Sequence, residues 1–164
     1  MKIKFCGAAR TVTGSSHLLM FNSGYKLLLD CGMFQGKQAY VDELNQNFLF
    51  NPAEIDVMIL SHAHIDHCGR LPKLVKEGFN GVIYCTEATA DLVAIMLADS
   101  AFIQEKDSEW HNEKRKRKGL EPIPPLYTTD DVPAVIDKLR RVPYETWVTI
   151  KPGIDFLFRD NGHI

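Results

Sequence analysis

Three histidines and one aspartate lie within six consecutive residues of this chain, at His62, His64, Asp66 and His67. Imidazole nitrogens and carboxylate oxygens can each donate a lone pair to a metal, and borderline divalent ions such as zinc prefer this mixture. In an extended segment, side chains two positions apart project to the same side. His62 and His64 can therefore share one ion, whereas Asp66 and His67 are better placed for a second ion. A surface loop without ligands is the alternative, which a single histidine would favour.

The residues on either side of this cluster predict its place in the fold. The preceding segment, 55–60, is short and apolar and predicts a buried strand. The following segment has Leu71, Leu74 and Val75 at helical spacing, with Gly78 as its stop. The cluster is therefore expected in a strand-to-helix loop at the carboxyl end of a strand, which is where α/β sheets bind ligands.

The segment His62–His67 matches the HxHxDH signature of the metallo-β-lactamase superfamily. Three further stretches, 5–15 with GAARTVTGS, 29–36 with DCGMFQG, and 160–164, resemble the β-CASP branch of that superfamily. This branch contains RNA nucleases related to the endonuclease subunit of the eukaryotic pre-mRNA 3′-end cleavage complex. The resemblance covers the chain from its fourth residue to its last. It implies an α/β protein with the first half of an αββα fold, a mixed β-sheet with flanking helices.

The resemblance also implies roles that the residues alone leave open. His163 matches the third motif of the superfamily and would complete the ligands of one ion together with His62 and His64. Asp66 and His67 would hold the second ion, and Asp66 would orient or deprotonate the attacking water. The complete site would contain two zinc ions. Zinc lowers the pKa of bound water to about 7, so that hydroxide is available at neutral pH.

Asp30 follows a predicted hairpin over 16–29 and lies just before Gly32. In the superfamily this aspartate supports the metal loop through hydrogen bonds, and such carboxylates are expected around metal ligands. An aspartate that starts a turn fits the local sequence equally well, and the resemblance favours the first role. His17 in the hairpin and Cys68 beside the cluster are expected to pack or hydrogen-bond rather than to bind metal.

The implied activity is that of a zinc-dependent hydrolase, an RNA phosphodiesterase acting as an endonuclease, a 5′-exoribonuclease or both. Two alternatives remain open. The same site hydrolyses esters, thioesters and lactams elsewhere in the superfamily, so HxHxDH does not select phosphate. The chain could also be a metal-binding fragment without turnover.

The bridging aspartate, the β-CASP insertion and the final histidine of that branch would all lie beyond residue 164. We therefore expect residues 1–164 to be the N-terminal part of a metallo-β-lactamase domain, truncated before those elements. This part is expected to be inactive alone and to need the remainder of the chain to complete the site. Such a half fold would expose one face of its sheet.

The amino-acid composition indicates the cellular compartment more clearly than it indicates a binding partner. The net charge of −2 does not indicate a nucleic-acid-binding protein. The apolar stretches are far shorter than the ~20 residues of a membrane span, so no membrane partner is expected. Four cysteines are scattered without a CxxC pair, which favours a reducing, cytoplasmic setting. The sequence does not indicate the oligomeric state.

A long helix is predicted after Thr86, which would cap its start. Its predicted apolar face contains Leu92, Ile95, Met96, Phe102 and Ile103. Its tail is a basic run formed by Lys114, Arg115, Lys116, Arg117 and Lys118. A solvated helix end, favoured by the helix dipole, is one interpretation of this run, and an RNA-contacting patch is the other.

The remaining segments predict a mixed sheet and a second helix. The expected strands are 2–5, the hairpin over 16–29, 81–85, 147–150 and 154–158. The expected helix has an apolar face of Val132, Val135, Ile136 and Leu139.

Overall fold

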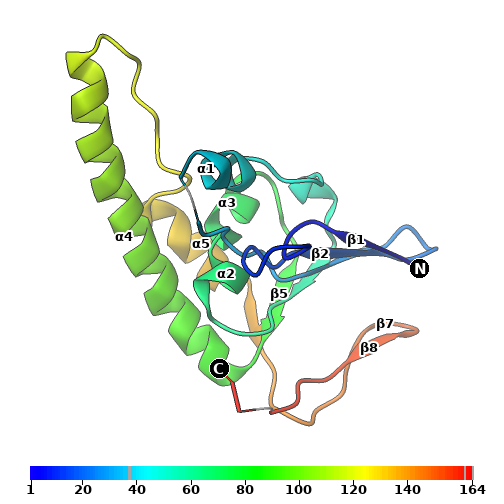
Figure 1. Ribbon diagram of the computed structural model, residues 1–164. Helices are drawn as coiled ribbons and strands as arrows, with labels where there is room; N and C mark the ends of the chain where they lie inside the picture. Colours follow the sequence, from blue (N-terminus) through cyan, green and yellow to red (C-terminus); the bar gives the residue numbers. More distant parts are fainter. Residues whose placement is uncertain (37, 161, 164) are drawn as a thin grey trace.

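The computed structural model describes residues 1–36, 38–160 and 162–163. A six-stranded mixed sheet forms the centre of this part, with strands in the order β1 to β6 (Figure 1). These strands are β1 (Lys2–Phe5), β2 (His17–Met20), β3 (Lys26–Leu29), β4 (Val57–Ile59), β5 (Val82–Cys85) and β6 (Leu139–Arg141). Strands β1 to β3 pair antiparallel, and β3 to β6 pair parallel. The predicted mixed α/β class is confirmed.

Helices cover one face of this sheet. They are α1 (Gln38–Gln46), α2 (Ile65–Cys68), α3 (Leu71–Lys76), α4 (Glu87–Arg117) and α5 (Val132–Ile136), with short 3-10 helices at Pro52–Glu54 and Thr129–Asp131. Side chains alternate between the faces of a strand. Leu18, Leu28, Met58 and Ile83 therefore share the covered face, and each is at most 4% exposed. They belong to one core with apolar side chains of α3, α4 and α5.

The opposite face of the sheet is only partly covered. Strands β7 (Val148–Lys151) and β8 (Ile154–Phe156) form a separate two-stranded sheet. The Phe156 ring lies against Tyr84 of β5, with 5.2 Å between ring centroids. Ile3 and Phe5 of β1 remain 49% and 63% exposed. Apolar side chains are thus exposed at the β1 edge of the sheet.

Several local signals act as the sequence predicts. The Thr86 hydroxyl oxygen accepts a hydrogen bond from the Thr89 backbone N–H at 3.2 Å and caps α4. Gly78 has a φ of 109°, which favours glycine, and it follows the end of α3. The hairpin of β2 and β3 forms with His17 paired to Leu29.

Two helix predictions were wrong in detail. The predicted apolar face of α4 is exposed, with Leu92, Ile95, Met96, Phe102 and Ile103 each 37–68% exposed. The helix instead buries Ala90, Val93, Leu97 and Ala101. Both faces of α4 are apolar, and the small alanines allow close packing, so the larger side chains did not reveal the buried face. Leu139 belongs to β6 rather than to the helix before it.

Within the described ranges, every helix is either too short or too polar to cross a lipid bilayer.

Candidate metal centre

The sheet topology brings Asp30 and the histidine loop together. β3 and β4 are parallel neighbours, so the residues that follow them emerge at the same edge. Asp30 follows β3, and its backbone N–H donates to the Ile59 carbonyl at 3.0 Å. The loop from Ser61 to His64 follows β4 and leads into α2, which carries Asp66 and His67. The predicted strand–loop–helix placement is confirmed.

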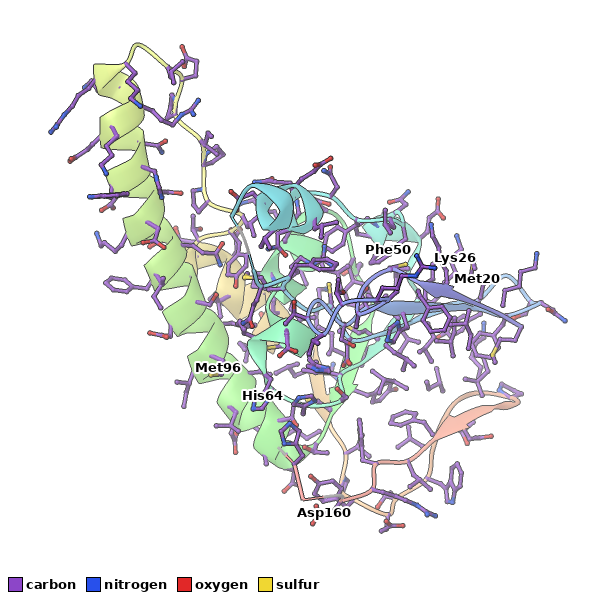
Figure 2. All side chains as sticks on the ribbon, in the orientation of Figure 1. Met20, Lys26, Phe50, His64, Met96 and Asp160 are labelled. Carbon is purple, nitrogen blue, oxygen red and sulfur yellow. The ribbon has the colours of Figure 1, made fainter. Side chains whose placement is uncertain are left out.

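Three imidazoles converge at this edge. The nitrogens of His62, His64 and His163 that can bind a metal all lie within 4.8 Å of one another. Their ring centroids are 4.6–4.8 Å apart. Figure 2 labels His64 here, and it labels Asp160 on the segment that returns to this edge. The three histidines grouped by the resemblance are therefore neighbours in space, and their nitrogens suit a zinc ion.

Asp66 and His67 lie directly beside these imidazoles. The Asp66 Oδ2 atom is 3.6 Å from His67 Nε2, which is close enough for both atoms to bind one ion. The His67 ring centroid is 3.9 Å from that of His62. A second ion held by this pair would thus be adjacent to the first. Their assignment as metal ligands stays a prediction.

The Asp30 carboxylate organises the loop beneath the histidines. Its Oδ1 accepts a hydrogen bond from the Ser61 N–H at 2.8 Å. Its Oδ2 accepts from the hydroxyls of Ser61 and Ser15 at 3.0 Å each, and lies 2.8 Å from His67 Nδ1. A carboxylate can only accept, so Nδ1 is the nitrogen that donates to Asp30, and in the neutral imidazole the Nε2 lone pair is then free to bind a metal. This geometry agrees with the supporting role expected for Asp30.

The sequence reasoning missed Ser61 and Ser15. The Ser61 hydroxyl lies 3.0 Å from Asp30 Oδ2 and 3.0 Å from His62 Nδ1, so it links the carboxylate to a second imidazole. Ser61 immediately precedes the motif and could have been suspected on that ground. Ser15 lies 15 residues before Asp30, and the hairpin predicted over 16–29 places the two side by side, so it too could have been suspected.

Two imidazoles of the cluster differ in pKa. Burial, followed by the nearby His67, His64 and His163, lowers the pKa of His62 from 6.5 to about 4. Burial also acts to lower the pKa of His67, but the hydrogen bond and charge of Asp30 and the charge of Asp66 outweigh it and raise the pKa. His62 is therefore neutral at pH 7 and can donate a lone pair to a metal.

The lowered pKa of His62 predicts an acid-dependent loss of stability in the metal-free chain. A base whose folded pKa lies below its unfolded value stabilises the fold above the unfolded pKa, and this contribution is lost as the pH falls from 6.5 to about 4. His62→Ala should therefore flatten the fall in unfolding free energy over this window, as measured by urea unfolding. His111→Ala, at an exposed histidine on α4, should leave it unchanged. Equal slopes for His62→Ala and wild type would contradict the prediction.

Backbone hydrogen bonds hold α2 in place. The carbonyls of Ile65, Asp66 and His67 accept N–H groups from Met33 (3.0 Å), Ser15 (2.8 Å) and Cys31 (2.8 Å), respectively. A helix this short leaves most of its carbonyls without partners inside the helix. The stretches GAARTVTGS and DCGMFQG therefore supply the partners that fix the helix bearing Asp66 and His67.

Arg70 holds the loop after Asp30 in place from the interior of the fold. It is 1% exposed, and its guanidinium lies 5.0 Å and 4.8 Å from the ring centroids of Phe34 and Phe48. Its Nε donates to the Gly32 carbonyl at 2.7 Å, and Nη1 donates to carbonyls at the end of α1. A buried guanidinium needs such partners. It ties the loop after Asp30 to α1 and α3.

The basic run lies apart from the metal centre, whereas Cys68 and His17 serve as packing residues. The basic run Lys114–Lys118 is at the far end of α4 from the C-terminal segment (Figure 1). Lys114 Nζ stacks 3.2 Å from the Trp110 ring centroid. Its RNA contact stays a prediction. Cys68 is fully buried, and its Sγ donates to the Ala63 carbonyl. The His17 ring packs edge-on against Phe5.

Several relatives match this chain over its whole length, among them the following three. Ribonuclease TTHA0252 of Thermus thermophilus is 38% identical, and the chain covers 33% of that protein. Transcription termination factor FttA of Methanocaldococcus jannaschii is 30% identical, with 24% of it covered. Cleavage and polyadenylation specificity factor 73 of Drosophila melanogaster is 32% identical, with 22% covered. The chain thus spans a third or less of the length of these relatives.

The names of these relatives agree with the resemblance to RNA-processing β-CASP nucleases, which is confirmed. Residues 10–149 match the family model described as the metallo-beta-lactamase superfamily, whose members depend on metal. The match includes the HxHxDH segment and both strands that lead into the site. The chain therefore belongs to the metallo-beta-lactamase superfamily.

Proposed function

We propose that this chain carries the metal centre of a zinc-dependent hydrolase that cleaves RNA phosphodiester bonds. The observation that carries the proposal is the convergence of His62, His64 and His163 with Asp66 and His67 beside them. An RNA substrate is supported by relatives named as a ribonuclease, a termination factor and a cleavage factor. The activity would belong to the complete protein, because the chain spans a third or less of these relatives.

The donors fit two zinc ions. His62, His64 and His163 would hold one ion, and Asp66 and His67 would hold the second with a bridging carboxylate from the remainder of the protein. When bound, such ions supply Lewis acidity and a hydroxide at neutral pH. Asp66 would orient the attacking water and accept its proton. Asp30 would keep the His67 proton on Nδ1, so that Nε2 stays available.

The cysteines support the expected cytoplasmic setting. Cys6, Cys31, Cys68 and Cys85 are all free thiols, and all are buried. Free thiols persist in reducing compartments. We therefore propose that the protein is cytoplasmic.

Elemental analysis tests the metal centre. Protein purified without added metal is expected to retain at least one zinc ion per chain. The double variant His62→Ala/His64→Ala should lose it, because only one imidazole of the converging set remains. The matched control is His111→Ala, which removes an exposed histidine on α4. Equal zinc in the double variant and the wild type would refute the assignment.

The substrate is tested on the complete protein. The wild-type protein is expected to cleave single-stranded RNA. The Asp66→Asn variant should lose this cleavage. The control variant Asp107→Asn, on α4, should keep it. A chromogenic lactam and a thioester serve as competing substrates, since the superfamily site can hydrolyse both. If the protein hydrolyses a small ester or lactam but does not cleave RNA, the proposed ribonuclease function is wrong and the protein is a hydrolase of small substrates.

A further inference from the structure

The outer face of α4 carries an apolar stripe without a partner among the described residues. We call this set the outer stripe, and it consists of Leu92, Ile95, Met96, Phe102, Ile103 and Trp110, each at least 37% exposed. At about 100° per residue these side chains project on one side of the helix. The buried side chains, such as Val93 and Leu97, project on the opposite side. Large exposed apolar patches of this kind mark interaction surfaces.

A coiled-coil seam runs along this side of α4, with steps that alternate between four and three residues. It contains Leu92, Met96, Ile103 and Trp110 of the outer stripe together with two charged residues, Asp99 and Lys106. A mean step of 3.5 residues keeps one seam facing a second helix. α4 has 31 residues and is therefore about 46 Å long. Figure 1 shows that it forms one side of the molecule and extends past the rest of the fold. A second helix of similar length could lie along it.

We propose that α4 pairs antiparallel with α4 of a second copy of this chain. A two-fold axis beside Ile103 would place Met96 against the second copy's Trp110, and apolar side chains would meet there. The same axis would bring Lys106 of the second copy to within one residue, about 1.5 Å along the helix, of the level of Asp99. Charged residues in such seams set register and orientation.

Charge along α4 selects the antiparallel arrangement. In a parallel pair, Asp99 would face Asp99 of the second copy, and Lys106 would face Lys106 of the second copy. The basic runs 114–118 of the two copies would also lie side by side. Like charges in these positions destabilise the pair. In the antiparallel pair the basic run lies beside Glu87 and Asp91, which begin the second copy's helix. Asp91 also pairs with Arg141 of its own chain and remains exposed. The basic run thus has an acidic counterpart in its own sequence.

The mass in solution gives the first test. Light scattering after size exclusion, over roughly two decades of concentration, is expected to show twice the 18.6 kDa of one chain. Asp99→Lys and Lys106→Asp should each weaken the dimer by about tenfold or more, since each places like charges together twice across the two-fold axis. The double variant Asp99→Lys/Lys106→Asp should restore it. The matched control is Glu43→Lys on α1, which changes the same charge away from α4.

Cross-linking gives a geometric test. Ile103→Cys should be joined efficiently to its symmetry mate by a short bismaleimide, whereas Ala98→Cys, also exposed on α4 but off the outer stripe, should not. The four native cysteines are buried and should not react. A single chain at all concentrations would overturn the proposal. So would a dimer that is insensitive to Asp99→Lys but lost in Phe5→Lys, because it would use the exposed β1 edge. Unchanged zinc content in each variant checks that the fold is intact.

Discussion

Asp30→Asn is expected to weaken metal binding by about 10–100-fold while the chain still folds. The wild-type carboxylate accepts from Ser61, Ser15 and His67. An asparagine amide has one accepting oxygen and one donating nitrogen. The amide nitrogen would therefore point at a neighbouring N–H or O–H group that also donates, and no hydrogen bond could form there while that group keeps its proton. If the nitrogen faces His67, the imidazole proton is driven to Nε2, and that atom can no longer bind metal.

Asparagine is the informative replacement at this position because the backbone is unusual. Asp30 has a φ of 58°, a region that aspartate and asparagine tolerate better than most residues. Asp30→Asn therefore removes the charge without adding backbone strain. Unmatched hydrogen bonds should still lower the unfolding free energy by about 1–3 kcal/mol. Asp30→Ala should lower it further, because alanine leaves every donor unpaired and disfavours this φ.

Competition with a chromophoric chelator measures the zinc affinity, and urea unfolding measures stability. The matched control is Asp56→Asn, at an exposed aspartate that accepts a backbone N–H from Lys26 at 2.7 Å but lies outside the cluster. It should leave the zinc affinity unchanged. An Asp30→Asn protein with wild-type affinity would show that the carboxylate does not control the His67 proton.

Gly32→Ala is expected to lower the unfolding free energy by more than about 3 kcal/mol. A Cβ on Gly32 would stand 1.6 Å from the carbonyl oxygen of Asp66 and 2.1 Å from its carbon. These are backbone atoms, so no side-chain rotation can relieve the contact. The loop must move away from α2, which would also disturb Asp66 and His67. Urea unfolding monitored by circular dichroism measures the loss.

Gly24→Ala separates this steric effect from ordinary glycine strain. Gly24 has a φ of 86°, and a Cβ there would meet nothing within 4 Å. Its replacement should cost only about 1 kcal/mol, the usual cost of a side chain in the left-handed region. A Gly32→Ala protein that loses no more stability than Gly24→Ala would show that the loop and α2 separate easily.

The local elements were predictable because their signals lie within a few residues. Thr86 caps α4, Gly78 ends α3, and the HxHxDH segment follows its strand. These features depend on backbone geometry and on hydrogen bonds between neighbouring residues, so the residue types at these positions are enough to predict them. The buried side of α4 was predicted wrongly for a related reason. Its two faces are both apolar, and the sheet and α5, which lie elsewhere in the sequence, decide which one is covered.

The candidate metal-binding side chains could be predicted from the sequence, because His62, His64, Asp66 and His67 lie within six residues and their spacing sets where they point. His163 was expected only through the resemblance, since it lies about a hundred positions away from His64 and only the fold brings it near. Only the tertiary fold brings Ser61 to the Asp30 carboxylate. That contact requires parallel β3 and β4 to end at one edge, a non-local pairing that no local pattern encodes. Ser15 reaches the same carboxylate through the antiparallel β2–β3 hairpin, which is local in sequence.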